Sequence, residues 1–190
     1  MRLLPLGDQA AIAYLDDETA ALHFAAAVRG ADFPWLVDVV QAYTSVAVFF
    51  DLTRIDYARA AGALRPLTNQ AAGDYPVETR LHRIPCCYEL GLDLGRVADH
   101  TNLPAEQIIR LHAESTYTVY AIGFCPGFPY LGYLPPELSG VPRLEAPRLR
   151  LERGSVGLTG RQTPLSQLAQ RFRSGMNGGI TFHECHVKSS

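Results

Sequence analysis

A polar break near the middle of the chain is the feature that most constrains its fold. Residues 68–76 contain Gly73 and Pro76, and no apolar period of a helix or a strand continues through them. Each side of the break must therefore bury its own core. The 190 residues, 47% of them hydrophobic, are sufficient for two small cores. We expect one domain over residues 1–75 and a second that begins at residue 76.

The first part of the chain predicts a strand, a helix, two strands and a second helix. Apolar residues 10–15 precede the acidic cluster Asp16-Asp17-Glu18, which is typical of a helix start, and Gly30 follows the apolar stripe of that helix. Two β-branched and aromatic runs and one more helical stripe complete the order, at residues 37–40, 45–50 and 57–64. This order predicts an α+β domain with two helices on one sheet, as in ferredoxin-like folds.

The second part predicts shorter elements and more loops. We expect a strand over residues 80–88, a short helix over 94–100, a helix from Pro104 to about His112, and a strand over 116–122. Residues 123–147 are crowded with glycine and proline, which favours loops and sheet edges over long elements.

Charge and hydropathy exclude several classes of protein. The net charge of −2 argues against a dedicated binder of nucleic acid or of anionic membranes. Pro5 and Gly7 interrupt the first apolar residues, and no stretch reaches the roughly 18 apolar residues of a membrane span. We therefore expect a cytoplasmic protein with its four cysteines reduced.

An aromatic loop is the most unusual segment. Residues 123–133 place aromatic rings around a Pro-Gly turn, where a loop is normally polar; its candidate ligand-contacting residues are Phe124, Pro126, Gly127, Phe128 and Tyr130. Two interpretations stay open. The rings either fold back onto the loop's own core or form the wall of a ligand pocket.

An arginine-rich segment follows this loop. Between Arg143 and Arg173, seven arginines and two glutamates leave a local charge of +5. Arg143, Arg148 and Arg150, with the turn at Gly154 and Ser155, offer the planar donors and backbone N–H groups that bind carboxylate or phosphate. A solvated basic surface is the alternative. The only lysine is Lys188, with no glycine-rich run before it, so a Walker-type nucleotide loop is excluded.

Nucleophilic and metal chemistry receive little support. Cys125 lies in a Pro-Gly turn, and His112 could activate it, but no local nucleophile signature surrounds it. His183, Glu184, Cys185 and His186 are metal-ligand types, but one short cluster is too small for a closed zinc site. We predict no metal site.

Several motifs occur together in an order that resembles the allophanate hydrolase subunit 1 family. In the second part of the chain they read Ile84-Pro85-Cys86-Cys87-Tyr88, Gly91-Leu92-Asp93-Leu94, Leu111-His112, Gly123-Phe124-x-Pro126-Gly127-Phe128-x-Tyr130-Leu131, Pro142-Arg143, Pro147-Arg148, Gly154-Ser155-Val156 and Gly160-x-Gln162-Thr163. Leu6-Gly7-Asp8 and the strand pair from Val39 to Asp51 also resemble the family, so the resemblance covers about residues 3–163. The resemblance implies that a cyclophilin-like β-barrel domain of the carboxyltransferase type follows the N-terminal domain.

The resemblance also implies a function. The family includes a component of the bacterial ATP-dependent 5-oxoprolinase, a hydrolase that works with sister subunits C and A and uses ATP with Mg²⁺. Inhibition of a histidine kinase and a carboxyltransferase role in urea or allophanate metabolism are the alternatives. On the motif positions, His112 and Arg148 become candidate catalytic residues, and Gln162 and Thr163 join the candidate anion-binding residues. For His112, a role in holding the neighbouring strand by a hydrogen bond is the favoured alternative.

The chain departs from the family pattern after Thr163. Residues 164–190 lack the family's Tyr-Pro, Pro-Gly-Gly-Trp and Gly-Arg-Thr-Pro elements. We expect a divergent or frame-shifted tail, with a short helix over residues 164–173. We also expect the final strands to be missing, so that the barrel stays incomplete over residues 76–163.

Overall fold

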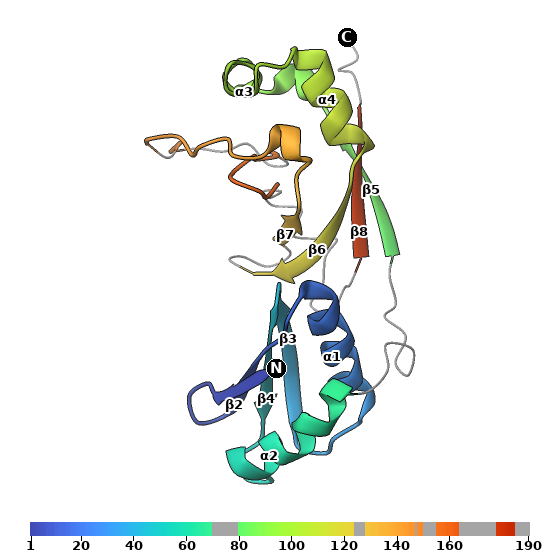
Figure 1. The fold of residues 1–190 in the computed structure, drawn as a ribbon, viewed down its shortest axis with the longest axis vertical. Helices are drawn as coiled ribbons and strands as arrows, with labels where there is room; N and C mark the ends of the chain where they lie inside the picture. The colour runs from blue at the N-terminus through green and yellow to red at the C-terminus, as the bar shows by residue number, and fades with distance from the viewer. Residues whose placement is uncertain (70–79, 124–127, 147, 150–154, 164–177, 185–190) are drawn as a thin grey trace. The chain divides into compact units, whose positions relative to one another are not determined.

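A computed structural model describes residues 1–69, 80–123, 128–146, 148–149, 155–163 and 178–184. The chain divides into two compact units, Met1–Glu78 and Thr79–Ser190. Each unit contains its own sheet (Figure 1). Each unit also has its own hydrophobic core. The fold is therefore a mixed α/β arrangement built on two small sheets.

The first unit is an antiparallel four-stranded sheet with two α-helices. Its strands lie in the order β1-β2-β4-β3, and its elements are β1 (Arg2–Pro5), β2 (Ala10–Tyr14), α1 (Glu18–Gly30), β3 (Leu36–Ala42), β4 (Ser45–Phe50), α2 (Tyr57–Leu64) and a short 3-10 helix (Arg65–Asn69). The predicted sequence of strand, helix, two strands and helix is confirmed. The additional strand β1 was missed because Pro5 interrupts its pattern. Pro5 is tolerated at the end of an edge strand, where its missing N–H costs little.

Aspartate caps start both helices of this unit. The side chain of Asp17 accepts a hydrogen bond from the backbone N–H of Ala20 at 2.7 Å, and Asp56 does the same for Arg59 at 2.8 Å. These bonds satisfy backbone donors that the first helical turn leaves unpaired. The acidic residues that predicted a helix start therefore act as caps.

The core of the first unit lies between its helices and one face of its sheet. Phe24 and Val28 of α1 and Leu64 of α2 join a single buried cluster with residues of the strands, among them Val46, Val48 and Phe50. Both helices therefore cover the same face (Figure 1). Trp35 belongs to the cluster and stacks on Phe33, which packs against it, at 4.5 Å between ring centroids.

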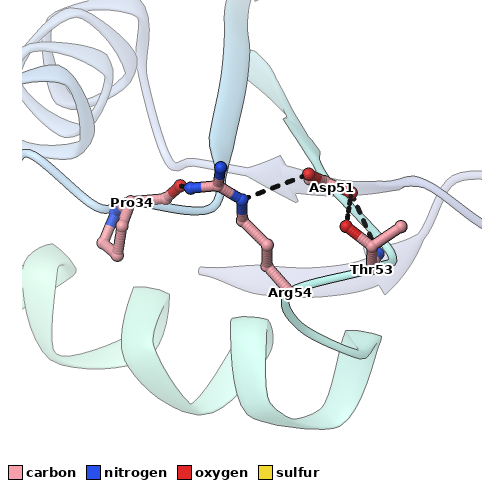
Figure 2. A network of polar contacts seen from close by, with 4 residues as sticks. All are labelled: Pro34, Asp51, Thr53 and Arg54. Atoms are coloured by element: carbon pink, nitrogen blue, oxygen red, sulfur yellow. Dashed lines mark hydrogen bonds and ion pairs between the residues drawn. The ribbon is translucent and has the colours of Figure 1, made fainter.

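A polar network fastens the connection from β4 to α2 (Figure 2). The carboxylate of Asp51 accepts hydrogen bonds from the backbone N–H and hydroxyl of Thr53 and pairs with Arg54 at 3.3 Å. Arg54 also donates to the carbonyl of Pro34 at 2.6 Å, which joins this connection to the loop before β3. The Thr53 hydroxyl bond, followed by the Thr53 backbone bond, lowers the pKa of Asp51. This exposed network stabilises the turn between β4 and α2 and contains no candidate site residue.

The second unit contains a mixed four-stranded sheet in the order β5-β8-β6-β7. Strand β8 pairs with β5 in parallel and with β6 antiparallel, and β7 pairs antiparallel with β6. The elements are β5 (Arg80–Cys86), a 3-10 helix (Tyr88–Leu90), α3 (Leu94–Thr101), α4 (Ala105–Glu114), β6 (Thr116–Ile122), β7 (Pro129–Gly132), a 3-10 helix (Pro136–Leu138) and β8 (Gly178–Glu184).

Helix α4 packs against β8, and α3 packs against α4 (Figure 1). Ile108 of α4, Tyr117 of β6 and Ile180 of β8 are fully buried in the resulting core. No helix among the described residues is long and apolar enough to cross a membrane.

One expectation for the second unit is corrected. The expectation that the final strands are missing is wrong for one strand, because Gly178–Glu184 forms β8 between β5 and β6. The described strands of this unit form an open sheet and not a closed barrel. Strand β8 fits this position because Ile180 and Phe182 are buried on the core side while Thr181, between them, is only half-buried. The helix predicted over residues 164–173 lies outside the described residues.

Candidate functional site

The candidate site residues fall on the second unit. The structure describes His112 on α4, Phe128 before β7, Tyr130 on β7, and five residues of the following loops, which are Arg143, Arg148, Ser155, Gln162 and Thr163. Phe124, Pro126, Gly127, Arg150 and Gly154 lie outside the described residues, as does Cys125.

His112 is buried and uses both ring nitrogens in hydrogen bonds. Its side chain is in the last turn of α4, and the whole residue is 2% exposed. Nδ1 lies 2.6 Å from the hydroxyl of Tyr88, and Nε2 lies 3.1 Å from Oγ1 of Thr163. Two motifs that are 51 residues apart in sequence, Leu111-His112 and Gln162-Thr163, therefore meet through this ring.

The bonding around Thr163 assigns the tautomer of His112. Thr163 Oγ1 has one hydrogen, and it donates that hydrogen to the carbonyl of Gly157 at 3.1 Å. His112 must therefore donate from Nε2 to Oγ1, and Nδ1 must accept from the Tyr88 hydroxyl. The chain of bonds runs in one direction, from Tyr88 through His112 and Thr163 to Gly157.

Aromatic rings keep His112 in its neutral form. Phe182 of β8 lies 4.6 Å from the imidazole between ring centroids, and Tyr117 of β6 lies at 5.3 Å. Burial in this cluster lowers the pKa of His112 to about 4, because the charged imidazolium would lose its hydration. Burial also raises the pKa of Tyr117 to about 12. These contacts suit a ring that holds neighbouring segments in place.

Arg148 forms an ion pair with Asp93, immediately before α3. Its Nη2 lies 2.5 Å from Oδ1 of Asp93, and both side chains are about one third exposed, at 34% and 38%. Asp93 belongs to the Gly91-Leu92-Asp93-Leu94 motif, so this ion pair also joins two segments of the resemblance. The carboxylate offsets the charge that we expected Arg148 to offer an anion.

Arg143 and Gln162 lie at one tight turn. Thr159 and Gln162 exchange two backbone hydrogen bonds, of 3.0 and 2.9 Å, around Gly160 and Arg161. Gly160 has φ +56°, a conformation that glycine adopts readily. Arg143 donates from Nε to the hydroxyl of Thr159 at 3.3 Å.

The described part of the aromatic loop takes part in ring contacts. The rings of Phe128 and Tyr130 meet edge to face, 5.1 Å apart between centroids. Tyr133 lies 5.7 Å from Tyr120, and the guanidinium carbon of Arg161 lies 4.4 Å from the centroid of the Tyr133 ring. Tyr133 is 37% exposed, so part of this aromatic surface faces solvent.

Sequence reasoning missed three partners in these contacts: Tyr88, Asp93 and Arg161. Tyr88 and Asp93 were visible as parts of motifs, and Arg161 is the variable position in Gly160-x-Gln162-Thr163. No spacing rule links them to His112, Arg148 or Tyr133, because each contact joins segments that only the fold brings together.

No group of three or more histidine, cysteine, aspartate or glutamate side chains within the described ranges could hold a metal ion. His183 and Glu184 end β8, while Cys185 and His186 lie beyond the described part of the chain.

Comparison with known proteins identifies the family. The sequence profile of the carboxyltransferase domain, subdomains C and D, matches residues 1–170. The chain belongs to this family, as its motifs predicted. Among its relatives, the 5-oxoprolinase B subunit of Bacillus subtilis strain 168 is 34% identical over 176 residues, covering 83% of this chain and 73% of the relative.

A second relative and a solved structure agree with this assignment. The 5-oxoprolinase B subunit of Escherichia coli O157:H7 is 36% identical over 147 residues, covering 75% of this chain and 66% of the relative. The crystal structure of TTHA0988 matches 96% of this chain with a TM-score of 0.75 and 26% identity. The chain spans just under two thirds of the E. coli relative and 41% of the TTHA0988 chain.

Proposed function

We propose that this chain is a component of an ATP-dependent 5-oxoprolinase. The complex would convert 5-oxoproline, ATP and water into glutamate, ADP and phosphate, with sister subunits C and A as partners. The observation that carries the proposal is the 34% identity to the 5-oxoprolinase B subunit of B. subtilis over 73% of that protein's length. We place the complex in the cytoplasm, where ATP is available.

The chemistry of the reaction explains why ATP is required. The carbonyl carbon of a five-membered lactam is a poor electrophile because the ring nitrogen donates electron density to it. Phosphorylation of the carbonyl oxygen by ATP would activate that carbon for attack by water. A protein that supports this step needs cationic donors for a carboxylate and for phosphoryl oxygens, and a dry wall around the ring.

The candidate residues are assigned to these tasks as parts of the proposal. Phe124, Pro126, Gly127, Phe128 and Tyr130 would form the apolar wall. The anion-binding donors would be Arg143, Arg148, Arg150, Gly154, Ser155 and Gln162. Thr163, which is buried and donates its hydroxyl hydrogen to Gly157, would position this segment and not donate to the anion itself. Arg148 would exchange its carboxylate partner Asp93 for the substrate's oxyanion. His112 would act through Thr163, because both of its ring nitrogens are already bonded. Mg²⁺ would arrive with ATP as its counterion.

The finer fold assignment belongs to the same proposal. The order β2-α1-β3-β4-α2 supports a ferredoxin-like arrangement of the first unit, with β1 as an added strand. For the second unit, the cyclophilin-like assignment stays a prediction.

Reconstitution with purified components tests the function. The chain is mixed with subunits C and A, and glutamate and phosphate are measured with 5-oxoproline and ATP present. We expect both products to form at equal rates, and only when this chain, ATP and 5-oxoproline are all included. The corresponding B. subtilis protein serves as the positive control. Restoration of activity by that control but not by this chain would contradict the proposal.

A further inference from the structure

Backbone hydrogen bonds fix the turn at residues 159–162, which contains Arg161. Besides the two bonds between Thr159 and Gln162, Gly160 donates to the carbonyl of Val141 at 3.2 Å and accepts from the N–H of Gly140 at 2.7 Å. The carbonyl of Arg161 accepts from the N–H of Leu134 at 2.9 Å. Bonds to two other segments therefore fix the backbone from which the Arg161 side chain extends.

The Arg161 side chain is ordered by an aromatic ring and not by a carboxylate. Its guanidinium lies over Tyr133, 4.4 Å from the ring centroid, and Tyr120 lies beside Tyr133 at 5.7 Å. Such stacking occupies the face of the guanidinium and leaves its N–H donors available. Arg161 is exposed, and no carboxylate of the described residues lies within 4.0 Å of it.

A second guanidinium lies beside the same turn. Arg143 bonds to Thr159 through Nε alone, so its terminal nitrogens make no hydrogen bond to the residues that the structure describes. Like Arg161, Arg143 has no ion-pair partner among those residues. Arg148 differs, because it forms an ion pair with Asp93. One arginine is thus part of this four-residue turn and another is bonded to it, and neither has an ion-pair partner among the described residues.

We propose that Arg143 and Arg161, on the turn 159–162 and with Tyr133 as the supporting ring, form a binding site for an oxyanion group. The planar donor fork of arginine matches a carboxylate or a phosphate. The inference rests on the proposed function, under which 5-oxoproline supplies a carboxylate and ATP supplies phosphates. It assigns anion recognition to Arg161, which the sequence motifs did not indicate, in addition to Arg143.

Binding to the isolated full chain tests the site without turnover. Inorganic phosphate, 5-oxoproline and ATP are titrated separately while the arginine Nε–H resonances are followed by NMR. We expect saturable shifts of Arg161 and Arg143 with phosphate and with at least one of the other two ligands. The responding ligand identifies the source of the oxyanion. Linear shifts without saturation, or shifts that miss both arginines, would overturn the inference.

Matched variants test which properties of Arg161 and Tyr133 the binding requires. Arg161→Gln is expected to weaken binding at least tenfold, whereas Arg59→Gln, at an exposed position on α2, leaves it unchanged. Tyr133→Phe keeps the ring and should bind like the parent protein, while Tyr133→Leu should bind severalfold more weakly. Arg161→Lys keeps the charge without the planar fork and should fall between the parent and Arg161→Gln. Equal affinities for Arg161→Gln and Arg59→Gln would overturn the site.

The inference and the proposed function fail in different ways. Saturable binding by a chain that does not restore 5-oxoprolinase activity would retain the anion site and reject the function. Full activity of an Arg143→Gln, Arg161→Gln double variant, with unchanged KM for both substrates, would reject the site and retain the function.

Discussion

At the residue scale, His112 shows how burial and hydrogen bonding select one protonation state and one tautomer of a side chain. The neutral ring donates at Nε2 and accepts at Nδ1, so each nitrogen has a partner of the opposite kind. Protonation would add a second donor where the Tyr88 hydroxyl already donates, and it would place a charge among the aromatic rings. The bonds of His112 therefore depend on its being neutral.

Stability should fall with acid because of this residue. The folded-state pKa of about 4 lies below the usual 6.5, so the unfolded chain binds a proton that the folded protein does not bind. The stabilisation is complete above pH 6.5 and is lost as the pH falls towards 4, a change of about 3 kcal/mol. Urea denaturation of the wild type and of His112→Gln should show a difference in unfolding free energy that narrows over this range. A constant difference would contradict the assignment.

Thr163 tests the same chain of bonds from its other end. Thr163→Val keeps the shape but leaves the buried Nε2 donor and the Gly157 carbonyl without their partner. We expect a loss of about 1–3 kcal/mol in unfolding free energy. Thr163→Ser retains the hydroxyl, so its loss of unfolding free energy should be clearly smaller. Equal losses in chemical denaturation would show that the methyl group, and not the hydrogen bonds, carries the stability.

At the element scale, β8 shows what a segment without family motifs can contribute. Its residues pair with β5 on one side and β6 on the other, and Ile180 and Phe182 belong to the core of the second unit. A strand at this position links the two halves of the sheet. The stability of the second unit should therefore depend strongly on residues 178–184.

Replacing one core residue of β8 should be costly. Phe182→Ala removes a ring that contacts both His112 and Tyr117, and we expect a loss of about 3–5 kcal/mol. Thr181→Ala, on the opposite side of the strand, should cost less than about 1 kcal/mol. Thermal or urea unfolding followed by far-UV circular dichroism measures both. A Phe182→Ala protein as stable as Thr181→Ala would mean that β8 is not part of the core.

At the scale of the whole molecule, the two units have separate cores built from separate sets of residues. Trp35, the only tryptophan of the chain, is buried in the core of the first unit. Its fluorescence therefore reports the unfolding of that unit alone.

The position of Trp35 makes it possible to test whether the two units unfold independently. Phe182→Ala should leave the midpoint of the tryptophan transition unchanged while it lowers the midpoint of the remaining far-UV transition. The expected trace is one transition by fluorescence and two by circular dichroism. Equal shifts by both probes would show that the units unfold together.

Local patterns in the sequence were sufficient for most elements of the first unit. Apolar spacing predicted α1, α2 and the paired strands β3 and β4, because a helix or strand with one buried face repeats its apolar residues at the period of that element. Strands β1, β7 and β8 were missed. β1 and β7 are only four residues long, and proline ends the first and begins the second. The pairing of β8 with β5 joins residues nearly one hundred positions apart.

The sequence by itself determined the family and the arginine and aromatic residues that the second unit carries. Only the tertiary structure decided which of those residues have partners. It pairs Arg148 with Asp93, bonds His112 to Tyr88 and Thr163, and leaves Arg161 stacked on Tyr133. The physical reason is that the apolar period that predicts a helix or a strand is a property of neighbouring residues. The countercharge, hydration and tautomer of a side chain depend on residues that reach it from elsewhere in the fold.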